Sequence, residues 1–434
     1  MASAVLIARS DPGGEKGMAA EQTREVAPAG PGFMAALTLA QIGAFISFMP
    51  LLQILLPLKV AALDPTHRAV TLAQISFWGA VAAGLANLFA GAISDRTTSR
   101  LGRRRPWLLG GAAGTLVAYV AIHLAGDVRE LMAGVIFFQI VFNFLFAALL
   151  ALVVDRVPEH QRGLISALLG LGYPLGSVGG AALVGGLIEN EALRFTALGA
   201  VVLVTVVPFA LLLRDRPISV EHRPSTRLAV FSPSFWIDPR KHPDFAFAWI
   251  GRFLVQIGFG LVQSYMLYYL LDVVRYPSLF PGHRAEQGLA ILTAIAAVTN
   301  VSFSLLGGLV SDRLRRRKPF VIVGAAILAA ATASFALAPS WPALMIAYAF
   351  HGLGAGLYFA VDIALVTQVL PSARDAGKDL GIVNLSNTVP QIIAPVIAVG
   401  LLGAAHADFR MLFLLAAGVC GVGALMVLPI RSVR

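Results

Sequence analysis

Apolar runs of about twenty residues recur along this chain of 434 residues, and they constrain its fold more than any other feature. A helix rises about 1.5 Å per residue, so about 20 apolar residues span the roughly 30 Å hydrocarbon core of a bilayer. Hydrocarbon offers no partner to backbone N–H and C=O groups, and helices satisfy these groups internally. Hydrophobic residues make up 58% of the chain and charged residues 13%, which excludes a water-soluble protein.

We therefore predict an all-α membrane protein with twelve transmembrane helices in two six-helix halves. The longest polar break divides the helices six and six, and the first 32 residues lack the apolar core of a cleavable signal. The predicted organisation is a disordered tail (1–32), a first half (33–213), a central loop (214–243), a second half (244–430) and a short tail (431–434). The predicted spans are 33–58, 71–94, 107–126, 131–155, 163–188, 195–213, 244–271, 288–311, 320–338, 342–370, 380–402 and 410–430.

The formal charge of +10 is concentrated in the connections on one side of these helices. If the N-terminal tail is cytoplasmic, connections on that side hold 25 of the 33 Lys and Arg residues, the other side holds 7, and Arg252 lies within a helix. Lys and Arg are retained in cytoplasmic loops. We predict an integral protein of the plasma (inner) membrane with both termini in the cytoplasm, and we do not expect nucleic acid as a partner.

A short motif repeats at half the chain length. The stretch "GAISDR" at Gly91–Arg96 returns as "GLVSDR" at Gly308–Arg313, each at the end of the second helix of its half and each followed by a basic run. Two halves related by a repeat are the architecture of many secondary transporters, with the substrate site between the halves near the midplane.

These motifs resemble two known groups of carriers. Gly91-x-x-x-Asp95-Arg96, followed by three arginines, is similar to the loop signature of the major facilitator superfamily. The longer stretch Ser99–Pro106 more specifically resembles the sucrose transporters and the glycoside-pentoside-hexuronide:cation symporters. The Asn143-to-Asp155 spacing and the stretch Leu380–Gln391 resemble their fourth and eleventh helices. The resemblance implies alternating access and the uptake of a sugar or glycoside.

The basic loop after the second helix has two interpretations. Arg–carboxylate pairs that are partly exposed contribute about 0 to 1 kcal/mol, a scale that suits a gate which must close and release. The alternative is that these arginines only fix the topology. The predicted cytoplasmic gate comprises Gly91, Asp95, Arg96, Arg104, Gly308, Asp312 and Arg313.

Asp155, at the cytoplasmic end of the fourth helix, also has two interpretations. Its position favours pairing with the arginines of the gate or capping a neighbouring helix. The resemblance to sucrose carriers instead implies a proton acceptor that faces substrate.

Arg252 and Asp362 are charged residues within predicted helices, where a lone ion costs several kcal/mol and persists mainly when paired or functional. Each lies about 7 or 8 residues, roughly 11 Å, from the same membrane face, so the two can be level. We predict a role in proton coupling or substrate binding. The alternatives are a snorkelling arginine and a static aspartate. His351, eleven residues before Asp362, is a weaker candidate for the same site.

Neutral amides and tyrosines on the helices expected to line the cavity suit a polyhydroxylated ligand, although such groups also serve as bonds between membrane helices. The candidates for substrate contact are Asn143, Gln139, Gln256, Gln263, Tyr265 and Asn387.

The sequence thus favours a proton-coupled symporter for a sugar or glycoside that works as a monomer. We expect no enzymatic activity, no metal and no cofactor, with the proton gradient as the energy source; no phosphate-binding P-loop motif occurs. One alternative is a proton-driven exporter of an amphiphilic drug or metabolite. Another is a non-transporting accessory or assembly protein with the same fold.

Overall fold

The computed structural model describes residues 28–215, 237–337, 340–370, 376–402 and 408–433. Within these ranges the description leaves out the side chains of Ala92, Asp95, Glu159, Arg162, Ala167 and residues 376–381. Twelve helical segments of the described chain are long and apolar enough to cross a membrane, and each overlaps one of the predicted spans. The prediction of an all-α, twelve-helix membrane protein is confirmed.

The regular elements of the described residues are helices, with an isolated bridge between Ser99 and Gly102. In the first half they are α2 (Pro31–Pro50), the π-helix η1 (Leu51–Leu55), α3 (Leu56–Leu63), α4 (Arg68–Asp95), α5 (Arg105–Leu124), α6 (Val128–Arg156), α7 (Glu159–Gly170), α8 (Gly172–Ala181), the π-helix η2 (Ala182–Leu187) and α9 (Glu191–Leu212). In the second half they are α10 (Pro243–Asp272), α11 (Tyr276–Leu279), α12 (Ala285–Leu314), α13 (Lys318–Leu337), α14 (Trp341–Gln368), α15 (Ala376–Leu402) and α16 (Phe409–Met426).

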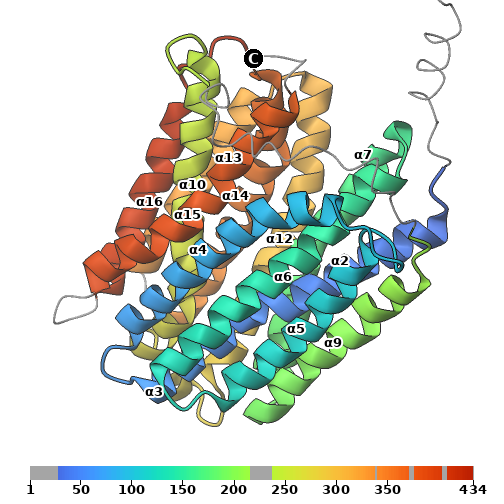
Figure 1. The fold of residues 1–434 in the computed structure, drawn as a ribbon. Coiled ribbons are helices and arrows are strands. Elements are labelled where there is room, and N and C mark those ends of the chain that lie inside the picture. Colours follow the sequence, from blue (N-terminus) through green and yellow to red (C-terminus); the bar gives the residue numbers. More distant parts are fainter. Residues whose placement is uncertain (1–27, 216–236, 338–339, 371–375, 403–407, 434) are drawn as a thin grey trace, which may run out of the picture.

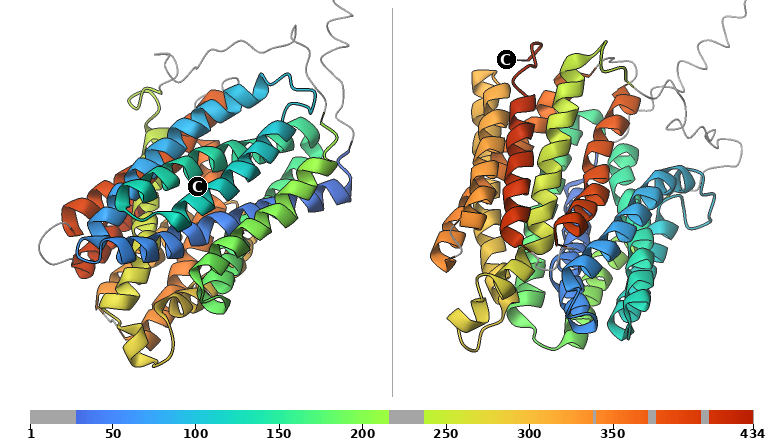
Figure 2. Two further views of the ribbon diagram at one scale, coloured as in Figure 1. Left: turned by 60° about the horizontal axis from the view of Figure 1, so that its bottom comes forward. Right: turned by 90° about the vertical axis from the view of Figure 1, so that its left-hand side faces the viewer.

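The helices form two groups that lie side by side, α2 to α9 in one and α10 to α16 in the other (Figures 1 and 2). Across the junction α4 packs on α15, and α12 packs on α8. In both contacts the second transmembrane span of one half meets the fifth span of the other half. The two junctions therefore repeat the same pairing, as the repeated sequence motif leads one to expect.

Two wide helical turns lie where the halves meet. The π-helix η1 follows Pro50 and packs on α10, whereas η2 contains Gly185 and packs on α12. Proline has no N–H to donate within a helix, and a local π turn accommodates that loss. A Cβ atom on Gly185 would lie 2.7 Å from the backbone oxygen of Glu286, so the two halves approach at backbone distance here.

Glycines set the spacing of helices inside the second half. A Cβ atom on Gly356 of α14 would overlap the backbone oxygen of Asn300 on α12. On the other side of α14, a Cβ atom on Gly354 would lie 2.6 Å from the backbone nitrogen of Leu328 on α13. Small residues let membrane helices approach closely, because packing rather than water exclusion drives their association.

We expect Gly356→Ala to lower the stability of the protein, because the added methyl group must push α12 away from α14. Overpacking of this kind costs about 1 to 3 kcal/mol. The apparent melting temperature of the purified protein in detergent measures the effect. Gly418→Ala is the matched control, since none of the described residues lies within 4 Å of a Cβ atom built on Gly418 of α16. Equal melting temperatures for the two variants would show that this close crossing does not matter.

Candidate functional site

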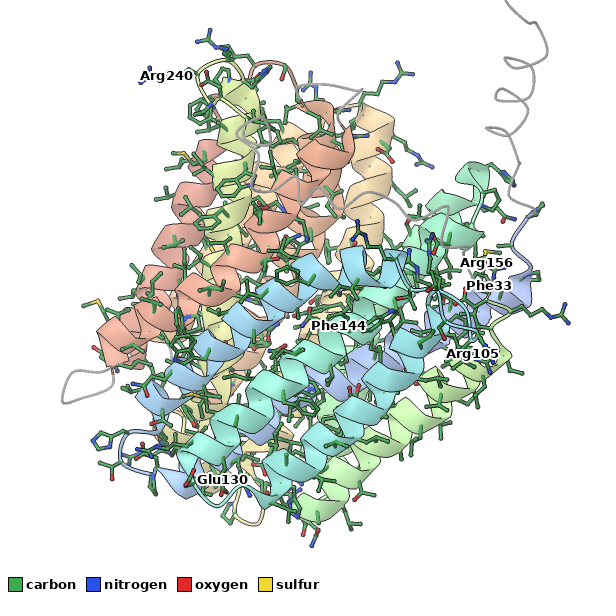
Figure 3. All side chains as sticks on the ribbon, viewed as in Figure 1. Phe33, Arg105, Glu130, Phe144, Arg156 and Arg240 are labelled. Atoms are coloured by element: carbon green, nitrogen blue, oxygen red, sulfur yellow. The ribbon has the colours of Figure 1, made fainter. Side chains whose placement is uncertain are left out.

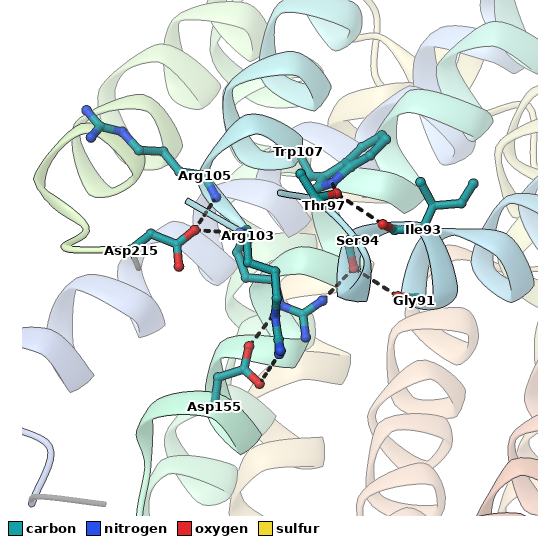
Figure 4. A network of polar contacts seen from close by, with 10 residues as sticks. Gly91, Ile93, Ser94, Thr97, Arg103, Arg105, Trp107, Asp155 and Asp215 are labelled. Carbon is teal, nitrogen blue, oxygen red and sulfur yellow. Dashed lines mark hydrogen bonds and ion pairs between the residues drawn. The ribbon is translucent and has the colours of Figure 1, made fainter. Parts of the chain in front are cut away.

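The predicted arginine loop forms a compact polar cluster, which we call the basic-end cluster: Ser94, Arg103, Arg104, Asp155 and Asp215 (Figure 4). Arg104 is buried with 3% of its surface exposed. It donates from Nε to Asp155 Oδ2 (2.8 Å) and from Nη1 to Ser94 Oγ (2.5 Å). Arg103 donates from Nη2 to Asp155 Oδ1 at 2.5 Å. One carboxylate thus accepts from two guanidinium groups.

The basic-end cluster joins several helices of the first half. Asp155 lies in the last turn of α6, Ser94 in the last turn of α4, and both arginines precede α5 or begin it. Asp215, just after α9, accepts from the backbone N–H groups of Arg104 (2.5 Å) and Arg105 (2.9 Å). Its carboxylate therefore satisfies amides at the N-terminus of α5, where negative charge is favoured.

Of the other members of the predicted gate, Gly91 touches this cluster, because its backbone oxygen accepts from Ser94 Oγ at 3.1 Å (Figure 4). Among the described residues, nothing lies within 4 Å of a Cβ atom built on Gly91 or Gly308. Asp312, in the last turn of α12, pairs with Arg317 of the following loop at 3.6 Å, and Arg313 is exposed. Arg96 is half-buried after α4, and the side chain of Asp95 lies outside the described residues. The contacts described above for the basic-end cluster join helices of the first half. Closure between the halves by these residues stays a prediction.

A second cluster, which we call the embedded cluster, comprises Arg252 and Gln256 of α10, Asp362 of α14 and Asn387 of α15. Arg252 (5% exposed) donates from Nη1 to Oδ2 of Asp362 (2% exposed). It also donates from Nη2 to Asn387 Oδ1 at 2.9 Å and from Nε at 3.2 Å. Gln256 Nε2 donates to the same oxygen at 2.8 Å. The prediction that Arg252 and Asp362 are level is confirmed.

The embedded cluster holds its charges by pairing them. A buried ion pair is tolerated when its geometry is good and further hydrogen bonds satisfy the remaining groups, and here the amide oxygen of Asn387 supplies the further acceptor for Arg252. Protonation of Asp362 would remove its charge and leave Arg252 with Asn387. The arrangement can therefore bind a proton, or exchange Asp362 for a ligand oxygen at Arg252.

A small cavity of about 40 Å³ lies deeper between the halves, against α8 on one side and α10, α12 and α14 on the other. It has room for water. Gln263 donates to the hydroxyl of Tyr173 across the junction at 3.0 Å. His351 stacks against Phe259 with ring centroids 5.5 Å apart, and its buried Nε2 has no hydrogen-bond partner among the described residues. The cavity therefore combines aromatic walls with an unsatisfied polar atom.

The remaining substrate candidates do not join these sites. Asn143 donates from Nδ2 to the backbone oxygen of Gln139 in its own helix at 2.7 Å. Gln139 is buried and faces Gly79 of α4, and Tyr265 is packed in the hydrophobic core. Their positions match the alternative interpretation, in which such residues serve helix packing. Within the described residues no group of three or more His, Cys, Asp or Glu could hold a metal ion.

Sequence reasoning missed the contacts that join the two halves at the end away from the arginine loops, which we call the opposite end. Arg194 of α9 donates to Glu286 of α12 at 2.9 Å, and both residues are buried. Arg68 of α4 pairs with Asp272 of α10. The sequence did carry a signal for these pairs. Asp272 ends α10 and Glu286 lies in the first turn of α12, on the same side of the membrane as Arg68 and Arg194, which the sequence analysis used only to predict topology.

Comparison with known families gives a match over nearly the whole chain. A family model described as "Major Facilitator Superfamily" matches residues 32–283 and 276–434. An uncharacterized MFS-type transporter of Schizosaccharomyces pombe is 29% identical over 138 residues, which are 32% of this chain and 30% of that protein. The multidrug resistance protein MdtL of Shewanella oneidensis is 31% identical over 142 residues, 32% of this chain and 35% of that protein. The match spans about a third of the length of each relative.

Solved structures share the fold at low identity. The nucleoside transporter NupG aligns with a TM-score of 0.74 and 12% identity, covering 92% of this chain and 99% of that chain. A peptide transporter POT in complex with sulfate aligns with a TM-score of 0.73 and 13% identity, covering 92% and 94%. A bacterial homolog of the lysosomal transporter Spinster, in an inward-facing conformation, aligns with a TM-score of 0.66 and 15% identity, covering 92% and 96%.

We expect Arg104→Gln to destabilise the protein more than Arg103→Gln, although both arginines bind Asp155. The side chain of Arg104 is 4% exposed and that of Arg103 is 22% exposed. Breaking a buried pair costs roughly 3 to 5 kcal/mol, whereas a partly exposed pair contributes about 0 to 1 kcal/mol. Apparent melting temperatures in detergent test this order, and equal losses would contradict it.

Proposed function

Since the chain belongs to the Major Facilitator Superfamily, a family of membrane transporters, we propose that it is a proton-coupled carrier of a neutral polar solute. A sugar or glycoside, taken up by symport and alternating access, is the solute proposed first. The orientation proposed is that predicted from the arginine loops, with both termini in the cytoplasm and the protein a monomer in the plasma (inner) membrane. The observation that carries the proposal is the embedded cluster of Arg252, Asp362, Asn387 and Gln256.

Proton coupling follows from the chemistry of that cluster. Asp362 can accept a proton when water reaches it, and the neutral acid no longer holds Arg252 by charge. Asn387 then keeps a hydrogen bond to the guanidinium, at 2.9 Å in the present conformation, so the arginine is not left without an acceptor. Loading and release of the proton would thus change how α10 and α14 are held together. A proton gradient is the energy source in this proposal, and no cofactor is involved.

Substrate recognition is assigned to the neutral amides beside the charges. Gln256 and Asn387 in the embedded cluster, and Gln263 with Tyr173 in the deeper cavity, offer both donors and acceptors. Sugars present many hydroxyl groups and apolar ring faces, which suit amides next to aromatic walls such as Phe259. These residues come from both halves, as a site between the halves requires.

Alternating access is supported by the asymmetry of the contacts between the halves. At the opposite end, Arg194–Glu286 and Arg68–Asp272 join the halves, and Tyr268 donates to the backbone oxygen of Pro57 at 2.8 Å. At the end with the arginine loops, the two groups of helices lean apart in Figure 1. We infer that this conformation is closed at the opposite end and corresponds to the cytoplasm-facing state.

An exporter of an amphiphilic drug or metabolite is the second candidate, favoured by the similarity to a multidrug resistance protein over about a third of each chain. Proteoliposomes separate the candidates. Sugar-driven alkalinisation of the medium supports symport, and drug-driven proton release supports antiport. Absence of flux for every solute that stabilises the protein, together with partner proteins that co-purify, would favour an accessory role.

We expect Asp362→Asn to abolish proton-driven uptake while solute counterflow persists, because the amide keeps its hydrogen-bonding atoms but cannot carry the proton. Uptake and counterflow are measured in the same proteoliposomes. Asp238→Asn, at an exposed position before α10, is the control and should leave both unchanged. Unchanged proton-driven uptake in Asp362→Asn would refute the coupling role.

A paired variant separates coupling from folding. Asp362→Asn leaves the guanidinium of Arg252 buried without its counterion, which is destabilising. The double variant Arg252→Gln with Asp362→Asn removes both charges. It should recover the melting temperature without recovering proton-driven uptake. Recovery of both would show that the Arg252–Asp362 pair only stabilises the protein and does not couple transport to protons.

We expect Glu286→Gln to shift the protein toward a conformation open at the opposite end, because the buried Arg194 loses its ionic partner. Spin labels at the exposed positions Arg129 and Ser278, in a Cys420→Ala background, report the separation of the halves there. The longer-distance population should grow relative to the parent. Glu130→Gln, which leaves the junction untouched, is the control, and a distance distribution that Glu286→Gln leaves unchanged would remove the pair from the gate.

A further inference from the structure

A large cavity lies at the end of the first half that carries the arginine loops, and Arg103, Asp155 and Asp215 of the basic-end cluster border it. Its volume is about 980 Å³, near the upper end of the roughly 300 to 1,000 Å³ of pockets that hold small molecules. Its walls come from the beginning of α2 and the end of α9. Figure 3 shows Phe33 and Arg156 beside each other at this place. We call it the interfacial groove.

The walls of the interfacial groove are apolar and face outward. Leu39 on α2 is 55% exposed, and Val204 and Leu212 on α9 are 72% and 82% exposed. Pro208 and Ala36 continue the same surface. In a bilayer this surface contacts hydrocarbon. The groove follows about eight residues of each helix, and at about 1.5 Å per residue it therefore extends some 12 Å into the membrane.

One end of the groove is closed and the other is charged. Toward the middle of the membrane, α2 and α9 touch, because a Cβ atom on Gly43 would overlap the side chain of Thr205. Toward the loops, the rim contains Arg103, Arg156 and Arg214. The groove is thus a blind apolar channel with a cationic mouth.

The acids at the mouth are already engaged, whereas two of the arginines offer donors. Asp155 accepts from Arg103 and Arg104, and Asp215 accepts from backbone amides at the start of α5. Arg156 donates from Nη2 to the backbone oxygen of Arg214. In the described part of the chain, the other N–H groups of Arg156 and the side chain of Arg214 have no carboxylate partner.

We propose that the interfacial groove binds one anionic phospholipid of the cytoplasmic leaflet. An acyl chain lies along Leu39, Val204 and Pro208, and the phosphate accepts hydrogen bonds from Arg156 and Arg214. Basic pockets between helices at the cytoplasmic surface suit anionic headgroups, and guanidinium groups bind phosphate in a two-pronged geometry. The proposal rests on the membrane-spanning fold and its orientation, and it does not depend on the transported solute.

Native mass spectrometry of the full-length protein, released from detergent with added lipid, tests the proposal. The probes are phosphatidylglycerol and phosphatidylcholine with identical oleoyl chains. Phosphatidylglycerol should bind more tightly, with one tightly bound copy. Arg156→Gln and Arg214→Gln should each weaken that binding about fivefold, while Arg240→Gln, which changes an exposed arginine just before α10, should leave it unchanged.

A second variant probes the channel itself. Val204→Trp fills the apolar wall and should weaken binding of both lipids, and the preference for phosphatidylglycerol should survive. Equal affinity for the two lipids would overturn the proposal. An equal loss of phosphatidylglycerol affinity in Arg240→Gln and Arg156→Gln would also overturn it, because the lipid would then bind through the overall surface charge and not at this groove. Tight binding that occurs only after deletion of residues 2–27 would also overturn it, because the tail would then be the native occupant.

Discussion

The absence of water in the bilayer core decides the architecture of this chain. Each backbone N–H and C=O in the hydrocarbon must find its partner within the protein, so the apolar runs become helices and polar irregular segments stay at the two ends. The helices then associate without the driving force of water exclusion, so the stability of their association depends on how closely their backbones can approach. Gly356 against Asn300 and Gly354 against Leu328 show how the second half meets that requirement, by bringing backbone against backbone. Even the wide turns η1 and η2 lie where helices of the two halves must fit against each other.

The same low-polarity environment explains where the charged groups lie. Charges occur at three levels, and at each level an arginine meets an acid: Arg104 with Asp155 near the loops, Arg252 with Asp362 within the helices, and Arg194 with Glu286 at the opposite end. The first pair joins helices of one half, the second joins helices of the other, and the third crosses between them. A change in the third pair therefore changes the relation of the halves, whereas the other two organise each half internally.

The length of the apolar runs and the positions of the charged residues predicted the fold well, because both can be read directly from the order of residues in the chain. The length of about 20 apolar residues that a transmembrane helix requires was enough to find the twelve spans. Counting residues from the membrane face placed Arg252 and Asp362 at the same depth in the membrane. The partner of a side chain depends on which helices become neighbours, which one sequence does not contain. For that reason the sequence did not show that Asn143 bonds to the backbone of its own helix, and the contacts of Asp215 and Glu286 went unnoticed. Gln256 and Asn387, two of the proposed substrate contacts, lie beside the buried Arg252, and their contact with substrate stays a prediction.

Burial of the Arg194–Glu286 pair also determines how this junction responds to its surroundings. Ions in solution screen exposed charges beyond about 8 Å at physiological ionic strength, but they screen buried pairs much less. Both members of this pair are more than nine-tenths buried. The contribution of this pair to closing the opposite end is accordingly set mainly by the protein itself, whereas the partly exposed Arg68–Asp272 pair responds more to the salinity of the compartment that this end faces.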